Sequence, residues 1–477
     1  MGKKASYKST QLHEFLKGSG ILVASNVVLK AAQLFLLPLY TRYLTPEVLG
    51  DSDNITAFAA FLFPLLVLAF DAAFSVFYYN KEGEEISENV FNTTFFFLLA
   101  QSMIPFLLQF RSAWISNLLF GTTEYAMGIR FSLIGIMVNL WFLPFALLVR
   151  MKNRMKLFAL INMIASLSML TLNILFVSVF QWGYMSLIAS TCVVNIVQFL
   201  LYIATAKVKI SKIFFDKALF KKMFRYALPM LPMTICIWVL NMSDRSMMRY
   251  FSGSYEVGLY GIGTRFVTVL TVMITGISTA YTTFAFKNER EDGAKELFAD
   301  VISGIFVLLA GICTTIAIFG KEIIALMASP VYAEAYKALN GLMFAQLVFA
   351  MNTFMGYGIA FKKKSKYFFY AVSIGAVINV VTNLMVLPTY GAQGAAMAAL
   401  LGQTLSFVFT YYYSMKLYPC DYGIRKIASL FVFLLTSSLL VREWAFAPKI
   451  AVWVFSATLV LWVYRRKISK VIKMIRS

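Results

Sequence analysis

The sequence predicts an all-α, polytopic membrane protein with about fourteen transmembrane helices. Hydrophobic residues make up 60% of the 477 residues and charged residues only 14%, and the mean hydropathy is +0.74. A water-soluble domain could not bury so much apolar surface in one core. Apolar stretches of roughly 20 residues, the length that crosses a bilayer core as a helix, recur along the chain. The alternating stretches of about 10 residues that would form barrel strands do not.

The apolar stretches can be placed one by one. The predicted spans are 20–40, 54–79, 90–110, 127–149, 157–180, 184–206, 226–248, 257–285, 297–320, 338–361, 367–388, 393–415, 427–441 and 450–464. The last two are the shortest. The first follows a basic tail but has no small-residue cleavage site, so we expect a retained helix and no signal peptide.

The basic residues predict the orientation of these spans. If the N-terminus is cytoplasmic, most of the 43 Lys and Arg residues fall in cytoplasmic connectors and tails. The positive-inside rule then predicts that both termini lie in the cytoplasm. Topology also explains the net charge of +21, so we do not expect nucleic-acid binding. The opposite connectors hold only Arg42, Arg111, Arg249, Lys321, Lys337, Arg442 and Lys449.

Residue counts argue against several kinds of catalytic site. The four cysteines are scattered and form no CxxC pair, and the single histidine, His13, lies in the N-terminal tail. A His-rich metal site and a His-based catalytic triad are therefore excluded. The sequence has no Walker A motif, so ATP hydrolysis is not expected. We predict a protein that is not an enzyme and has no resident cofactor or metal.

Two pairs of motifs indicate an internal repeat. In both pairs the members are separated by nearly the same distance along the chain, which favours duplication of a six-helix unit over chance similarity. An even number of helices preserves orientation, so the two lobes are expected to be parallel, with a substrate path between them. The first pair is Arg42-Tyr43-Leu44 with Glu47 to Gly50 and Arg249-Tyr250-Phe251 with Glu256 to Tyr260. The second is Lys156-Leu157-Phe158 with Asn173 and Lys366-Tyr367-Phe368 with Asn383.

The repeat predicts four segments. Residues 1–206 form an N-lobe of six helices, and residues 226–416 form a C-lobe of six more. Residues 207–225 are a basic cytoplasmic linker, which we expect to lie along the anionic inner membrane surface. Residues 417–477 add two helices and a basic cytoplasmic tail.

Ionisable residues within the predicted spans are the candidate functional residues. Each is costly in hydrocarbon unless it faces the bundle interior or an aqueous cavity. Lys30 and Arg265 lie too deep to reach the interface easily and come first, with a structural salt bridge as the alternative. Arg130 lies near the outer end of its span, where snorkelling is the simpler explanation. The full set is Lys30, Asp71, Arg130, Asp244, Arg245 and Arg265.

The two acidic candidates have open alternatives. Asp71, in an apolar stretch, either loads a proton or a sodium ion to couple transport or forms an ion pair with Lys30. Asp244, next to Arg245 near the outer end of span 226–248, is expected to pair across the lobes or to hold a gate.

Several motifs in the two predicted lobes can be compared with those of known families. They are Tyr226-Ala227-Leu228-Pro229-Met230-Leu231-Pro232, Trp238, Asp244-Arg245, Glu256 to Tyr260, Arg42 to Pro46 and Tyr390-Gly391. Together these motifs resemble the polysaccharide-biosynthesis branch of the MOP (MATE-like) flippases. The resemblance covers residues 20 to about 415 and implies a MATE/MurJ-like architecture of two lobes with two added C-terminal helices. It further implies a Wzx-type flippase that moves undecaprenyl-pyrophosphate-linked oligosaccharides across a bacterial cytoplasmic membrane, for capsule, exopolysaccharide or a related polymer.

This resemblance gives the candidates roles. Lys30 and Arg265 would hold the pyrophosphate, with Arg245 and Arg130 as further substrate-binding candidates, and arginine would grip phosphate oxygens bidentately. Asp71 and Asp244 would couple transport to H+ or Na+ or gate it. We expect a monomer, with membrane lipids and a polymerase or glycosyltransferase complex as partners. The rivals are a multidrug exporter of the MATE type, which would want an acidic cleft, a lipid II flippase and a non-transporting scaffold.

Overall fold

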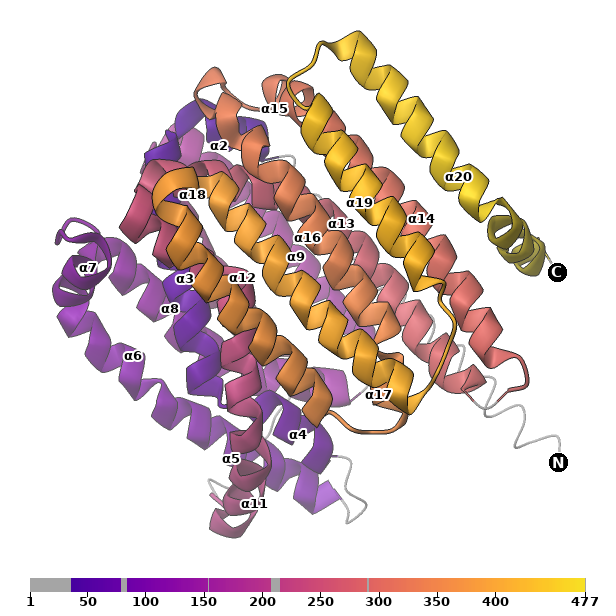
Figure 1. The fold of residues 1–477 in the computed structure, drawn as a ribbon. Helices are drawn as coiled ribbons and strands as arrows, with labels where there is room; N and C mark the ends of the chain where they lie inside the picture. Colours follow the sequence, from indigo (N-terminus) through magenta and orange to yellow (C-terminus); the bar gives the residue numbers. More distant parts are fainter. Residues whose placement is uncertain (1–35, 79–83, 153, 207–214, 290, 477) are drawn as a thin grey trace. The chain divides into compact units, whose positions relative to one another are not determined.

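The computed structural model describes residues 36–78, 84–152, 154–206, 215–289 and 291–476 (Figure 1). Within these ranges every regular element is a helix, which confirms the predicted fold class. The described chain divides into two compact units. The first contains Asp51–Trp238 and the chain before Thr45, and the second contains Thr45–Gly50 and Val239–Ser477. The predicted lobe boundaries at 206 and 226 stay predictions, because the units divide within the predicted span 226–248.

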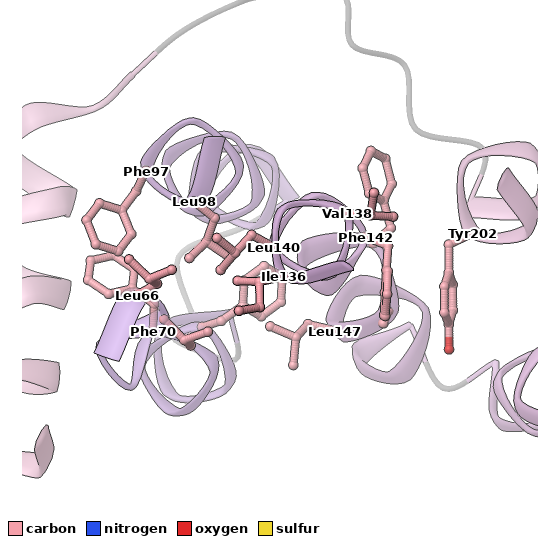
Figure 2. Close-up of a cluster of buried hydrophobic side chains, with 14 of the residues drawn as sticks. Leu66, Phe70, Phe97, Leu98, Ile136, Val138, Leu140, Phe142, Leu147 and Tyr202 are labelled. Carbon is pink, nitrogen blue, oxygen red and sulfur yellow. The ribbon is translucent and has the colours of Figure 1, made fainter. Parts of the chain in front are cut away.

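The first unit is built around aromatic side chains. The rings of Phe70 and Phe97 stack with their centroids 4.0 Å apart, and those of Phe142 and Tyr202 stack at 5.8 Å (Figure 2). Its elements are α2 (Leu37–Tyr43), α3 (Pro46–Val67, shared with the second unit), α4 (Phe70–Tyr78), α5 (Glu84–Gln101), α6 (Met103–Leu108), η1 (Gln109–Arg111), α7 (Ser112–Phe120), α8 (Ala126–Met151), α9 (Met155–Ile174), η2 (Leu175–Val179), α10 (Met185–Ala206), α11 (Lys217–Ala227) and η3 (Leu228–Met230).

The predicted span 54–79 is broken near its middle. Leu68 and Ala69 have φ angles of 50° and 56°, and α3 and α4 meet there at a bend of 41°. A left-handed conformation is unfavourable for residues with a Cβ, so the surrounding packing must stabilise the break. Hydropathy gives no sign of it, since both residues are apolar.

The end of the predicted basic linker is an ordered helix. Asp216 caps α11 by accepting hydrogen bonds from the backbone N–H groups of Ala218 and Leu219. The ring of Phe220 packs against Phe70 of the aromatic core, with centroids 5.8 Å apart, while Lys221 and Lys222 are exposed. The lysines therefore form the solvated face of an amphipathic helix.

The second unit contains a hairpin of two helices that together carry the single label α18. Helix α18 has 52 residues, about 78 Å if straight, which is far more than a bilayer core requires. Gly391 interrupts it with a φ of 47°, between the predicted spans 367–388 and 393–415, and the orange ribbon turns back there (Figure 1). The elements are α12 (Leu231–Ser252, shared with the first unit), α13 (Ser254–Asn288), α14 (Ala294–Ile318), α15 (Gly320–Met327), η4 (Pro330–Ala335), α16 (Tyr336–Met355), α17 (Tyr357–Phe361), α18 (Lys366–Leu417), α19 (Ile424–Val441) and α20 (Phe446–Arg476).

The number of membrane spans is lower than the sequence predicts when counted over the described residues. Eleven helices there are long and apolar enough to cross a membrane, or twelve if the bent pair of α3 and α4 is one span. Helix α18 accounts for two predicted spans at once. The predicted span 20–40 lies almost entirely outside the described residues, so fourteen stays a prediction.

The two C-terminal helices are tied to the rest of the second unit by ion pairs. Lys449 at the start of α20 is fully buried, and its Nζ lies 2.7 Å from Glu322 Oε1 in α15. The neighbouring Lys321 pairs with Glu443, in the connection between α19 and α20, at 3.3 Å. Helices α19 and α20, the yellow pair in Figure 1, both pack against α14.

Candidate functional site

A buried carboxylate forms the centre of a polar network in the second unit. Asp244 on α12 is only 1% exposed, and its two oxygens accept hydrogen bonds from Tyr260 Oη at 2.8 Å and Asn383 Nδ2 at 2.6 Å. Asn383 Nδ2 also donates to Asn379 Oδ1, at 3.2 Å. Three helices, α12, α13 and α18, therefore place polar side chains at one point inside the unit. Such groups are costly in a membrane interior unless they bond to each other, as these do.

An arginine pair lies next to this network. The Arg245 guanidinium donates to Thr264 Oγ1 at 3.3 Å and lies over the Tyr260 ring, 5.7 Å from its centroid. Arg265 follows Thr264 on α13 and is partly exposed. Because Tyr260 contacts both Asp244 and Arg245, the carboxylate network and the first arginine are physically linked. The structure thus links two predicted site residues, Asp244 and Arg245, through Tyr260, and Arg265 is the next residue after Thr264 on α13.

The break in α18 is stabilised by two side chains at the junction of α12 and α13. Ser252 Oγ donates to the carbonyl of Leu387, at the end of the first half of α18. Glu256 Oε2 accepts the N–H of Ala392, at the start of the second half, at 2.7 Å. A broken helix leaves such backbone groups without partners, and a carboxylate also suits the positive end of a helix. Glu256 and Gly391, from separate sequence motifs, therefore form one structural feature.

The two echoing Glu-Val motifs meet at their glycines. A Cβ on Gly50 would lie 2.0 Å from the carbonyl oxygen of Ser254, and one on Gly258 would lie 2.0 Å from that of Pro46. The first turn of α3 and the start of α13 are therefore in direct backbone contact within the second unit, which only glycine permits.

The remaining predicted residues lie elsewhere. Asp71 is exposed in the first turn of α4, immediately after the break at Leu68 and Ala69. Arg130 is exposed on α8, where its Nε donates to Ser112 Oγ at 2.8 Å. Both belong to the first unit. Lys30 lies outside the described residues, so neither its predicted contact with substrate nor its alternative pairing with Asp71 can be placed.

Helix α13 also carries a row of threonines, which a rule based on charged residues does not detect. Its members recur every three or four residues, the spacing that places them along one side of a helix. Most donate their hydroxyl proton to a carbonyl one turn earlier in α13, which leaves each oxygen available as an acceptor. The regular spacing of the threonines is visible in the sequence, but the residues between them are mostly apolar and make the segment look like an ordinary membrane span. The row comprises Thr264, Thr268, Thr271, Thr275, Thr279 and Thr282.

The chemistry of the network suits a small hard cation. Its heteroatoms are carboxylate, amide and phenol oxygens, the ligands that hard cations prefer. Asn383 Oδ1 is buried and accepts no hydrogen bond from the described residues, although its own Nδ2 donates to Asp244. The described residues contain no group of three or more His, Cys, Asp and Glu that could hold a metal ion. One carboxylate among neutral oxygens matches a monovalent charge better than a divalent one.

Comparisons with known proteins agree with this architecture. A family model described as "Polysaccharide biosynthesis protein" matches residues 15–287, and one described as "MatE" matches residues 229–385. An uncharacterized membrane protein of Methanocaldococcus jannaschii is 26% identical over 219 residues. That match spans 43% of this chain and 42% of the archaeal protein, so it covers less than half of the relative.

Solved structures share the fold over most of the chain. The lipid II flippase MurJ superimposes with a TM-score of 0.73 at 16% identity, covering 94% of this chain and 99% of MurJ. A multidrug resistance MATE transporter of the MOP superfamily gives a TM-score of 0.68 at 14% identity, covering 84% and 96% of the two chains. A MOP superfamily transporter from Pyrococcus furiosus gives 0.56 at 16% identity, covering 87% and 96%. At these identities the likeness concerns the fold alone.

Proposed function

This chain belongs to the polysaccharide biosynthesis protein family of the MOP superfamily, and we therefore propose that it flips undecaprenyl-pyrophosphate-linked oligosaccharide units across a bacterial cytoplasmic membrane. The family is one of multi-pass membrane transporters and flippases. That the cargo is a lipid-linked saccharide is our proposal. In this proposal the headgroup enters a cleft that is open to the cytoplasm. The cleft then closes on that side and opens on the other, and the headgroup leaves on the outer side.

The observation that supports an anionic cargo is the arginine pair on α12 and α13. Arg245 is held by Thr264 and the Tyr260 ring, and the partly exposed Arg265 follows on the same turn of α13. Guanidinium groups can bind two oxygens of a pyrophosphate in one plane. An exporter of organic cations would instead need a carboxylate facing its cargo, whereas Asp244 is buried and occupied by neutral donors.

The Asp244 network is the proposed coupling site. A proton or sodium ion bound there would reorganise the hydrogen bonds from Tyr260 and Asn383, which join α12 to α13 and α18. Because Tyr260 also lies under Arg245, loading the site would change the position of a proposed substrate-binding cation. This gives a physical route from ion binding to cargo binding.

Transport into liposomes tests the proposal. The purified chain is reconstituted with undecaprenyl pyrophosphate carrying one N-acetylglucosamine, with lipid II, or with ethidium as an organic cation, and translocation is followed by protection of the headgroup or dye. We expect movement of the glycosylated pyrophosphate, and a loss of at least about tenfold in rate for Arg265→Gln, because a charge-assisted bond is worth about 1.5–3 kcal/mol. Arg111→Gln, which removes an exposed arginine of the first unit that has no proposed role, is the matched control.

The outcome of the three cargoes separates the candidate functions. Movement of ethidium alone would replace the proposal with drug export, and movement of lipid II alone would assign a peptidoglycan role. No movement of any cargo in the wild-type chain would favour a scaffold. Asp244→Asn is then assayed with and without H+ and Na+ gradients: we expect the dependence on one gradient to disappear, and a retained dependence would remove Asp244 from coupling.

A further inference from the structure

A pocket of about 370 Å³ lies in the second unit at the C-terminal end of α13. It is bounded by α13, α16, α17 and the start of α18, and its volume falls in the range of about 300–1,000 Å³ that is usual for small-molecule sites. None of the predicted site residues contributes to it. Its lining consists of aromatic and small polar residues: Thr282, Phe286, Phe349, Asn352, Thr353, Gly356, Tyr357, Ala360 and Phe368.

Aromatic side chains form much of the pocket wall. Phe286 is 50% exposed and meets the Tyr357 ring edge-on, with centroids 6.1 Å apart. The Phe368 ring lies directly on the backbone of Gly356, since a Cβ there would be 2.9 Å from the ring. Aromatic faces of this kind provide large apolar area with a slightly negative surface. They suit the C–H face of a pyranose ring, which is apolar and slightly positive.

The polar groups of the pocket are mainly hydrogen-bond acceptors. Thr282 Oγ1 donates its only proton to the carbonyl of Ser278, at 2.7 Å. The 2.5 Å hydrogen bond between Tyr357 Oη and Thr282 Oγ1 must therefore use the tyrosine proton. Both oxygens keep lone pairs but have no proton left to give. Such a pocket selects a ligand rich in donors, as the hydroxyl groups of a sugar are.

The charges around the pocket argue against a cationic ligand. The described residues that line it include no carboxylate. The connection between α17 and α18, which joins the lining residues Ala360 and Phe368, carries the exposed cations Lys362, Lys363 and Lys364. A positively charged drug would be repelled there, while a neutral or acidic saccharide would not.

The pocket is separate from the arginine pair. Thr282 and Arg265 lie on the same helix, about 26 Å apart along its axis at 1.5 Å per residue. One monosaccharide and the pyrophosphate bonded to it cannot span that distance. A saccharide bound in the pocket would therefore hold the lipid at a stage when its pyrophosphate has not reached Arg265.

We propose that this pocket is a saccharide subsite, which binds a sugar of the cargo through ring stacking on Phe286 and Tyr357 and acceptance of sugar hydroxyls by Thr282 and Tyr357. The assignment rests on the proposed function, because it takes the cargo to be a lipid-linked saccharide. The pocket selects for the sugar, and the arginine pair acts on the pyrophosphate at a different stage. Sugar recognition and anion recognition should then be separable by mutation.

Binding of matched lipids tests the subsite. Dissociation constants are measured on the full chain in lipid nanodiscs for undecaprenyl pyrophosphate and for the same lipid bearing one N-acetylglucosamine, glucose or galactose. We expect at least one sugar to tighten binding to the wild type by about tenfold, the worth of one or two hydrogen bonds. Phe286→Ala and Thr282→Val should each bring this ratio close to one while leaving the bare lipid unaffected.

Controls and outcomes distinguish the pocket from the proposed function. Phe110→Ala and Thr171→Val, which alter an exposed ring and an exposed threonine of the first unit, should keep the sugar ratio. A ratio that survives in both pocket variants, or that is absent for every sugar in the wild type, overturns the subsite while bare-lipid binding still supports the proposed function. No binding of any lipid to the wild type overturns the proposed function and the subsite with it. Phe286 is half exposed, so its variant is expected to fold.

Discussion

Asn173 in the first unit and Asn383 in the second occupy matching places in the predicted repeat but make different bonds. Both side chains are fully buried. Asn173 Nδ2 donates within its own helix, to the carbonyl of Met169 at 2.7 Å. Asn383 Nδ2 donates to the Asp244 carboxylate, on another helix, at 2.6 Å. The same residue is therefore a local feature in one unit and part of a network between helices in the other.

The difference shows that the same residue type, at matching places of the predicted repeat, can have different structural roles. A buried amide bonded to its own helix can be replaced at little cost, since the carbonyl keeps its helical partner. A buried amide bonded to a carboxylate cannot, because the carboxylate would lose a donor in a medium that offers no water. In the second unit the amide is therefore part of the network around Asp244, whereas in the first it bonds only within its own helix.

Replacing each asparagine by leucine should produce the largest difference between the units. Asn383→Leu removes one of the donors to Asp244, so we expect the free energy of unfolding to fall by about 3 kcal/mol. Asn173→Leu has similar volume and loses only a bond within its helix, so a change below about 1 kcal/mol is expected. Denaturant unfolding in one detergent measures both.

A double variant gives the control. In Asn383→Leu with Asp244→Leu both partners are replaced by apolar groups, and part of the lost stability should return if the cost arises from the unsatisfied carboxylate. Equal losses in Asn383→Leu and Asn173→Leu would mean that the two asparagines play the same structural role, and the comparison between the units would fail.

Glycine substitutions should give the next largest effect. An alanine at Gly258 would press its Cβ against the carbonyl oxygen of Pro46, where a gap of 2.0 Å leaves no room. We expect Gly258→Ala to lower the free energy of unfolding by about 2 kcal/mol, because a backbone contact cannot yield as a side chain would. Gly311→Ala on α14 is the control, since a Cβ added there would meet nothing within 4 Å. It should be neutral or gain up to about 1 kcal/mol from helix propensity. Similar thermal stability of the two variants would show that the contact at Gly258 is loose.

Hydropathy and charge predicted the helical class, the approximate spans and the gap at Gly391, because each depends on residues close together in the sequence. The break at Leu68 and Ala69 could not be predicted, since apolar residues forced into a left-handed turn carry no local signal. The extent of each unit could not be predicted either, because it depends on packing between segments that are distant in the sequence.

The candidate site was predictable only in part. The cost of a charge in hydrocarbon selects Asp244, Arg245 and Arg265 as candidates, and their functional roles stay predictions. Their partners were missed, because Tyr260 is a neutral residue on the next helix and Asn383 lies far along the chain. The sequence marks Asn383 only as one half of a repeat. A rule based on charge alone finds the costly groups and overlooks the neutral groups that stabilise them.

The smallest effect is expected at the ion pairs that tie the C-terminal helices to the rest of the second unit. The two pairs differ in how far they are buried. Lys449 is fully buried, whereas about half of Glu443 is exposed to solvent. The hydrogen bond from Tyr336, together with Lys321, lowers the pKa of Glu443 below its usual value of 4.5. A carboxyl group with a lowered pKa in the folded state adds stability above its unfolded pKa and loses it as the pH falls through the folded pKa.

Glu443→Gln should therefore cost less than about 1 kcal/mol at pH 7, as expected for a solvent-screened pair. The difference from the wild type should shrink as the pH falls below 4.5 and vanish once the pH is below the lowered pKa of Glu443. Thermal melts from pH 7 to pH 3 measure this convergence. Glu334→Gln, which removes a carboxylate from the exposed pair with Lys337, is the control for loss of one negative charge. A constant difference between the wild type and Glu443→Gln across this pH range would contradict an electrostatic role, and would leave the Tyr336 hydrogen bond as a packing contact that is insensitive to charge.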